Sequence, residues 1–365
     1  MSKQKVELLS PAGNLEKLKI AIKYGADAVY GGVSHFSLRI RASKEFTYET
    51  FKEAIDYAHE RGKKVYATIN GFPFNSQIEL LKTHIKKMAE LKPDAFIVAA
   101  PGVVRLCREI APQIDIHLST QANVLNYLDA QVFWDMGVKR IVVAREISLK
   151  DVMEIKKHLP DMEIEIFVHG SMCFAYSGRC LISAVQMGRV PNRGSCANDC
   201  RFEYTLYAGN DEHGSLFRLE EEPGVGTYIF NSKDMNLASH IQEILDSGAV
   251  DSLKIEGRTK SPYYAAVTAK AYREAIDDYY AGKFEPEKYQ KELHTTKNRG
   301  FTDAYLIHKP FEKTDSQNHD YALSKGSYEV TGLVTEDEHH FLCKYKVYPN
   351  EDIEIFTPHN TVLDT

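Results

Sequence analysis

Cysteine is scarce in this 365-residue chain, yet four of its six cysteines fall within the 28 residues from Cys173 to Cys200. Cys173 and Cys180 lie in HGSMCFAYSGRCLIS, and Cys196 and Cys200 lie in RGSCANDCR. Four thiolates can hold a structural zinc ion or an iron–sulfur cluster. Zinc sites commonly use two pairs of cysteines that are close together in the sequence. Only Cys196 and Cys200 have that short spacing, so the pattern modestly favours an iron–sulfur cluster. A redox disulfide and four buried packing residues are the alternatives.

The residues around these cysteines suit a charged centre. Glycines at positions 170, 178, 188 and 194 let the backbone turn tightly. Four arginines would offset the negative charge of a cluster or bind an anionic substrate: Arg179, Arg189, Arg193 and Arg201. The two remaining cysteines, Cys107 and Cys343, fall in a helical and a strand pattern, and we expect both to be packing residues.

The composition is typical of a soluble protein, with 43% hydrophobic and 26% charged residues. The net charge of −6 disfavours a broadly basic surface that coats nucleic acid, although it allows a local basic mouth. No apolar run approaches the roughly 20 residues that cross a membrane. The start, MSKQKVELLSPAG, lacks the apolar core of a signal peptide. We therefore expect a cytoplasmic protein, in which clustered cysteines stay reduced and indicate a metal or catalysis.

Short β-rich runs alternate with amphipathic helical stretches along the chain. Strands are expected at 6–11, 27–32, 64–70, 94–100, 115–123, 138–144, 163–170 and 250–257. Helices are expected to follow them at 14–25, 47–62, 77–91, 102–110, 127–137, 148–159, 236–248 and 263–282. Eight such units predict a closed parallel (β/α)8 barrel of the TIM type. A doubly wound open sheet is the alternative, but its glycine-rich dinucleotide loop is missing after the first strand.

The barrel is expected to span residues 1–315 and to include a long cysteine-bearing insertion at 171–235, after the seventh strand. Chemistry in such barrels takes place at the C-terminal ends of the strands, so the insertion should lie on the active face. Within it, 202–208 and 226–231 should form a β excursion. Residues 326–365 alternate apolar and polar side chains, which predicts a small, truncated C-terminal β domain.

Polar residues at strand ends supply candidates for catalysis. His169 ends the seventh strand beside the cysteines and is a candidate proton donor. Lys254 and Glu256 lie on or just beyond the eighth strand, where alternation points both to one face. The alternative for each is structural, as a buried histidine or as members of an ion pair.

Further strand ends offer substrate contacts. Asn70, after the third strand, and Gln121 and Asn123, after the fifth, can hydrogen-bond a base edge. The arginines that can hold a phosphate or a dicarboxylate through paired hydrogen bonds are Arg39, Arg145, Arg179 and Arg258. A salt bridge to a nearby carboxylate is the alternative role.

The segment EIFVHGSMCFAYSGRCLIS, residues 165–183, resembles the signature of the collagenase-like U32 peptidase family. The signature positions are filled by Glu165, Phe167, Gly170, Cys173, Gly178, Cys180 and Ser183. The resemblance covers about residues 5–310 and includes NRGSCANDCR, NSKDMNL and SLKIEGRTKSPYYAA.

This resemblance implies a [4Fe-4S] protein of oxygen-independent hydroxylation. Its cluster ligands would be Cys173, Cys180, Cys196 and Cys200. Members most similar to this chain make 5-hydroxyuridine at the wobble position of tRNA, with prephenate as the oxygen source. Others hydroxylate a ribosomal RNA cytidine or the ubiquinone ring. The resemblance thus implies tRNA and prephenate as partners and allows a second subunit of the same family, while the lack of a long apolar run predicts no membrane partner.

The family name itself implies a peptidase. The sequence contains neither an HExxH zinc motif nor a GxSxG elbow. A cysteine nucleophile would need a histidine base, for which His169 is the candidate. A protease of collagen-like chains and a zinc-stabilised binding module are thus the competing functions.

Overall fold

A computed structural model of the chain describes residues 5–33, 36–38, 46–173, 175–205, 207–210, 214–218, 231–303, 305–308, 316, 318, 326–328, 330–334, 340–350, 352–358 and 361–364. Arg39 lies outside these described residues, as do most of residues 226–231.

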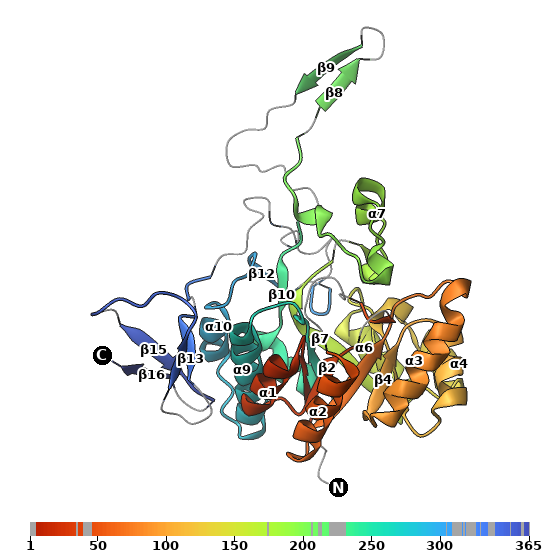
Figure 1. Cartoon of the computed structure of the whole chain (residues 1–365), viewed down its shortest axis with the longest axis horizontal. Helices are drawn as coiled ribbons and strands as arrows, with labels where there is room; N and C mark the ends of the chain where they lie inside the picture. Colours follow the sequence, from red (N-terminus) through yellow and green to blue (C-terminus); the bar gives the residue numbers. More distant parts are fainter. Residues whose placement is uncertain are drawn as a thin grey trace.

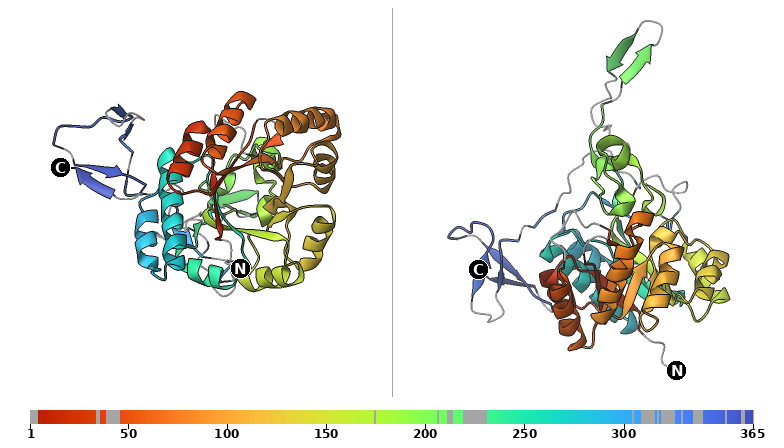
Figure 2. Two further views of the ribbon diagram at one scale, coloured as in Figure 1. Left: turned by 90° about the horizontal axis from the view of Figure 1, so that it is seen from below. Right: turned by 45° about the vertical axis from the view of Figure 1, so that its right-hand side comes forward.

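Eight parallel strands close into a barrel, which Figure 2 shows as a ring of strands inside a ring of helices. The strands are β1 (Glu7–Pro11), β2 (Ala28–Gly31), β3 (Lys64–Ile69), β4 (Ala95–Val98), β5 (Asp115–Leu118), β6 (Arg140–Val142), β7 (Glu163–Ser171) and β11 (Ser252–Ile255). Closure is complete because β11 pairs with β7 on one side and with β1 on the other. The predicted TIM-type barrel is confirmed.

A helix follows each barrel strand and buries its apolar face against the sheet. The helices are α1 (Leu15–Lys23), α2 (Tyr48–His59), α3 (Ile78–Glu90), α4 (Pro101–Ile110), α5 (Tyr127–Asp135), α6 (Leu149–His158), α8 (Ile241–Asp246) and α9 (Pro262–Tyr280). Local sequence sets several starts: Asn14, Ser148 and Ser261 each accept a hydrogen bond from the first turn of the following helix. None of the described helices is both long and apolar enough to cross a bilayer.

The strand β7 is longer than its neighbours and carries the sheet beyond the barrel. Its end pairs antiparallel with β10 (Asp234–Asn236), which in turn pairs with β12 (Phe301–Thr302). The chain that leaves the barrel at Ser171 therefore returns to the same strand after the cysteines. The sequence pattern did not predict this return strand.

The insertion contains a β-hairpin, as expected, but from different residues. It pairs β8 (Tyr207–Asn210) with β9 (Ser215–Arg218), whereas the second strand was expected at 226–231. In Figure 1 the hairpin projects far from the barrel, beyond the short helix α7 (Ile182–Met187).

The C-terminal region forms two small antiparallel pairs among its described residues. They are β13 (Gly332–Val334) with β14 (Phe341–Cys343), and β15 (Ile353–Phe356) with β16 (Thr361–Asp364). Figure 1 places them beside α9 and α10 (Pro286–Leu293). The ring of Tyr24, directly after α1, stacks on Phe356 at a centroid distance of 5.3 Å, and the Tyr24 hydroxyl donates to the Phe356 carbonyl at 2.7 Å.

The two isolated cysteines differ in environment. Cys107 is fully buried in α4, as predicted, and burial raises its thiol pKa to about 12. Cys343 is exposed on β14, so the prediction that it packs in a core was wrong. The alternation around it belongs to a two-stranded pair, which has no second layer to cover that face.

The interior of the barrel is charged rather than wholly apolar. Arg140 lies 2.5 Å from Glu7, 2.6 Å from Glu163 and 3.2 Å from Glu165. Glu165 also binds the Lys254 ammonium at 2.6 Å. Burial alone would raise the pKa of Glu7, but the Arg140 guanidinium more than offsets this and holds that pKa below its usual value. Every one of these charges is thus paired in a connected network.

Candidate functional site

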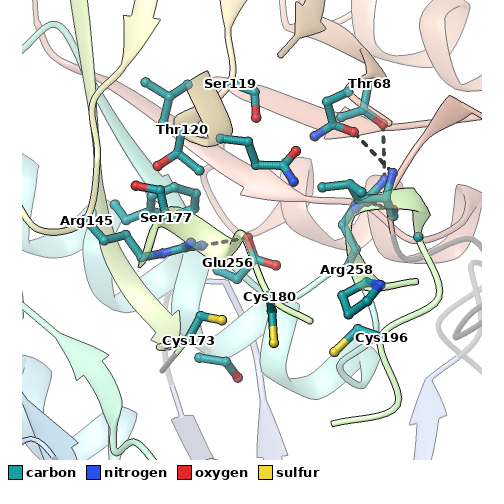
Figure 3. Close-up of a pocket in the computed structure, with 18 of the residues that line it drawn as sticks. Thr68, Ser119, Thr120, Arg145, Cys173, Ser177, Cys180, Cys196, Glu256 and Arg258 are labelled. Carbon is teal, nitrogen blue, oxygen red and sulfur yellow. Dashed lines mark hydrogen bonds and ion pairs between the residues drawn. The ribbon is translucent and has the colours of Figure 1, made fainter. Parts of the chain in front are cut away.

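A cavity opens at the C-terminal ends of the barrel strands, under the cysteine-bearing insertion (Figure 3). Its walls combine strand-end residues with the loop that carries the cysteines. The polar and charged residues among its lining are Thr68, Asn70, Ser119, Thr120, Gln121, Arg145, Ser171, Ser177, Ser183, Asp199, Lys254, Glu256 and Arg258. The cavity thus lies on the face where barrel enzymes hold their substrates.

All four clustered cysteines line this cavity: Cys173, Cys180, Cys196 and Cys200. Burial raises the thiol pKa of Cys180, and the nearby thiols of Cys173 and Cys196 raise it further. The pKa of Cys200 is also raised, first by burial, with the other three thiols adding to the effect and Arg201 opposing it. The four sulfur atoms are therefore close enough to influence one another's ionisation.

The donor set consists of four thiols, which can hold either a zinc ion or an iron–sulfur cluster. A zinc ion needs sulfur atoms about 3.8 Å apart, because its bonds to sulfur are about 2.3 Å long and tetrahedral. Among the residues that the structure describes, no three His, Cys, Asp or Glu side chains are gathered in a way that would hold a single metal ion. The four sulfurs instead line a shared space, as Figure 3 shows for three of them. Four thiols on one cavity are the kind of donor that a zinc ion or an iron–sulfur cluster uses, and their positions do not choose between the two.

Neighbouring barrel loops hold the cysteine loop in place. The Ser177 amide and hydroxyl donate to the Glu146 carboxylate, after β6, at 2.6 and 2.8 Å. The guanidinium of Arg179 donates to the Gln121 carbonyl, after β5, at 3.0 Å. Arg193 donates to Gln77, after β3, at 2.8 Å. The positions of the cysteines therefore depend on three separate strand ends.

Contacts inside the loop also reach the sulfurs. The Ile182 amide donates to the Cys180 sulfur at 3.3 Å. The Ser183 hydroxyl accepts from the Ala197 amide at 3.1 Å, which joins the two cysteine-bearing halves of the loop. Backbone N–H groups directed at sulfur stabilise the thiolate form that metals require.

Lys254 and Glu256 both line the cavity, as their alternation on β11 predicted. Lys254 pairs with Glu165 and lies 4.5 Å from the centre of the Tyr30 ring. Glu256 lies 3.6 Å from Arg145, a pair that Figure 3 marks. The position of Glu256 depends on a close approach of β7, because a Cβ on Gly170 (φ +117°) would lie 2.5 Å from the Glu256 carbonyl oxygen.

Four of the predicted substrate contacts also reach the cavity: Asn70, Gln121, Arg145 and Arg258. The Arg145 guanidinium lies over the Phe167 ring at 4.1 Å. Arg258 is buried, donates to the hydroxyls of Ser37 at 2.7 Å and Thr68 at 3.1 Å, and also bonds the Leu38 carbonyl. The Asn70 side-chain oxygen accepts from the Leu38 amide at 3.1 Å.

Two other candidates, Asn123 and Arg179, lie outside the cavity lining. Asn123 adopts a left-handed conformation (φ +66°) that ends the turn after β5. Arg179 is exposed and holds the cysteine loop through its bond to the Gln121 backbone. Their positions favour structural roles over the substrate contacts expected of them.

His169 is also absent from the cavity lining. Its ring is buried among Tyr264, Tyr272 and Phe301, at centroid distances of 5.8, 5.6 and 5.5 Å. Burial, with a smaller contribution from Lys260, lowers its pKa to about 3. Strict alternation would place His169 on the same face as Phe167 and Ser171, which both line the cavity, but the register between β7 and β11 shifts at this point, between Lys254 and Ile255. The geometry favours a structural role for His169 and gives it no path to a bound substrate.

Sequence reasoning missed Asp199. This residue lies between Cys196 and Cys200, is 1% exposed and lines the cavity. Neither of its carboxylate oxygens has a hydrogen-bond partner. The available signal in the sequence was an acidic residue between two cysteines, in CANDC, but nothing in the sequence indicated that it would be buried.

The model of peptidase family U32 matches residues 13–316. The tRNA hydroxylation protein P of Helicobacter pylori is 68% identical over 358 residues, which cover 98% of this chain and 85% of that protein. The 23S rRNA 5-hydroxycytidine synthase of Escherichia coli is 35% identical over 277 residues, 76% of this chain and 40% of the synthase. The collagenase of Porphyromonas gingivalis is 31% identical over 314 residues, 82% of this chain and 73% of the collagenase.

Proposed function

The chain belongs to peptidase family U32, and from that premise we propose that it hydroxylates a pyrimidine in RNA, specifically the wobble uridine of tRNA, to give 5-hydroxyuridine. The observation that carries the proposal is the high identity, over nearly the whole chain, to a protein named for tRNA hydroxylation. The cysteine-lined cavity at the catalytic end of the barrel supports it, because it combines a redox-capable donor set with polar groups that can bind a base.

In this proposal the target nucleotide leaves its stack and enters the cavity as an unpaired base. The cavity wall offers it the hydrogen-bonding side chains of Asn70, Ser119, Thr120 and Gln121. A wobble base is already in a single-stranded loop, so little base pairing is lost on entry. The cavity walls would exclude water from the reacting carbon.

The four cysteines would hold a [4Fe-4S] cluster, which supplies one-electron transfer when bound. Hydroxylation replaces the C5–H bond of uracil with a C5–OH bond, so the base loses two electrons. The oxygen donor gives up one oxygen atom and gains those two electrons. Prephenate is the proposed donor, and its two carboxylates match the guanidinium groups of Arg145 and Arg258 on the cavity wall.

Proteolysis is the alternative that the family name and the collagenase relative support. A cysteine protease needs an imidazole within hydrogen-bond reach of its thiol. The described residues that line the cavity include no histidine, and His169 is enclosed by aromatic rings outside it. The site geometry therefore supports hydroxylation better than peptide cleavage.

The test is mass spectrometry of tRNA nucleosides from a deletion strain that lacks every paralogue. We expect 5-hydroxyuridine derivatives to disappear and to return on complementation with the intact gene. Unchanged levels in the deletion strain would overturn the proposal. Anaerobic purification tests the cofactor separately: about four irons per chain are expected, and one zinc with no iron would favour a binding module.

A further inference from the structure

Two buried side chains from different segments of the chain present polar atoms without hydrogen-bond partners to the cavity. Asp199 comes from the cysteine loop and Gln121 from the turn after β5. They are 1% and 5% exposed, and both line the cavity. Neither carboxylate oxygen of Asp199 has a hydrogen-bond partner among the described residues, and the side-chain oxygen of Gln121 has none among them either.

Other charged groups on the same walls have partners. Arg145 pairs with Glu256, Lys254 pairs with Glu165, and Arg258 donates to two hydroxyls. Leaving a buried polar group without a partner costs free energy, and a carboxylate costs more than an amide. Since two such groups face one cavity, the missing partners are best supplied by a ligand that enters it.

The chemistry of the two groups defines that ligand. A carboxylate accepts hydrogen bonds and repels anions, so Asp199 requires an N–H or O–H donor rather than a phosphate. The Gln121 amide offers one donor group beside its acceptor. The base edge of uridine carries one N–H, at N3, between the carbonyl oxygens O2 and O4. It therefore presents a donor for Asp199 and an acceptor for Gln121 side by side.

We propose that Asp199 and Gln121 bind the substrate base: Asp199 accepts a hydrogen bond from N3–H of uracil, and Gln121 donates to a carbonyl oxygen next to it. This assignment rests on the proposed function, because it takes uridine as the base that enters the cavity. It adds to the site a residue for base recognition that lies between two cysteines.

The test measures binding rather than turnover. The reconstituted holoprotein is titrated with two anticodon stem-loop RNAs that carry uridine or 3-methyluridine at the wobble position. Methylation removes the N3–H donor, so the intact protein should bind the methylated RNA at least about tenfold more weakly, as expected for loss of a hydrogen bond to a charged group. In Asp199→Ala the ratio between the two RNAs should fall towards one, because the acceptor is gone.

Glu203→Gln is the matched control, since Glu203 is an exposed acid in the same loop, and the tenfold ratio should survive in it. If Asp199→Ala keeps the full ratio, the assignment is wrong. Absorbance of the cluster is recorded for each variant. If Asp199→Ala does not retain the cluster, Gln121→Leu decides: weaker binding of the uridine RNA by about fivefold or more supports the assignment, and unchanged binding overturns it.

The proposed function can fail separately. If the deletion strain retains its 5-hydroxyuridine, the function is wrong whatever the binding data show. If the deletion strain loses the modification while Asp199→Ala keeps full discrimination, only the recognition role fails.

Discussion

The barrel interior and the cavity above it both contain buried charged residues, but the two regions differ in whether those residues have partners within the chain. In the interior, Arg140, Glu7, Glu165 and Lys254 form a connected network in which each charge has a partner at 3.2 Å or less. In the cavity, Asp199 is buried without any. Buried charges that are paired within the chain hold its strands together, whereas a buried charge that is unpaired is available to a ligand.

The first prediction breaks the function while sparing the interior. Cys180→Ser should lose the iron centre and reduce tRNA hydroxylation to background, because the cavity loses one of four sulfur donors. Iron content and nucleoside mass spectrometry measure the effect, and circular dichroism should show the barrel still folded. Cys343→Ser is the control, since Cys343 is exposed on β14 far from the loop in sequence. Full iron content in Cys180→Ser would contradict the cluster assignment.

The second prediction breaks the paired region. Glu165→Gln should lower the free energy of unfolding by about 3–5 kcal/mol, because it leaves the Lys254 ammonium buried without its carboxylate. Urea titration followed by circular dichroism measures the change. Adding Lys254→Met should recover much of the lost stability by removing the orphaned charge. No recovery in the double variant would show that Glu165 acts mainly through Arg140.

The third prediction concerns His169. Burial in the folded protein lowers the pKa of His169 to about 3, whereas the usual pKa of a histidine is 6.5. Between these values the unfolded chain binds a proton that the folded chain does not, so stability present above pH 6.5 is lost as the pH falls. From pH 7 to pH 5 this histidine should cost about 2 kcal/mol. In His169→Gln the loss measured by urea titration at the two pH values should be smaller by that amount.

The same variant tests the catalytic role. Since His169 lies outside the cavity, His169→Gln should retain tRNA hydroxylation at neutral pH in proportion to the folded protein present. A folded, iron-loaded His169→Gln protein without activity would return His169 to the list of catalytic residues.

The fourth prediction has the smallest expected effect and compares the sign of the stability change in the cavity with that in the barrel interior. Asp199→Asn should leave the free energy of unfolding unchanged or raise it by about 1 kcal/mol, because it removes a buried charge that has no partner. Glu165→Gln, the same chemical change in the paired region, should lower it. Loss of more than about 2 kcal/mol in Asp199→Asn would show that the carboxylate stabilises the loop instead.

Much of the fold followed from local patterns. The eight strands and their helices were predictable because apolar periodicity is a local pattern. Capping residues such as Asn14 and Ser261 also bond backbone groups only a few residues away. The hairpin strand Ser215–Arg218 was not predicted, because the sequence pattern placed the second strand of the insertion at 226–231 instead. The return strand Asp234–Asn236 was missed because its partner residues, Ser171 to His169, lie far earlier in the chain.

The site divides in the same way. By its spacing alone the sequence determined that four cysteines share one loop, and by its strand ends it determined which polar residues were candidates. Only the tertiary structure decided that Lys254 pairs with Glu165, 89 residues away, and that His169 lies outside the cavity lining. It also decided that Asp199 is buried without a hydrogen-bond partner among the described residues. Pairing and burial depend on the register of strands and loops that are distant in the chain, and no local pattern encodes that register.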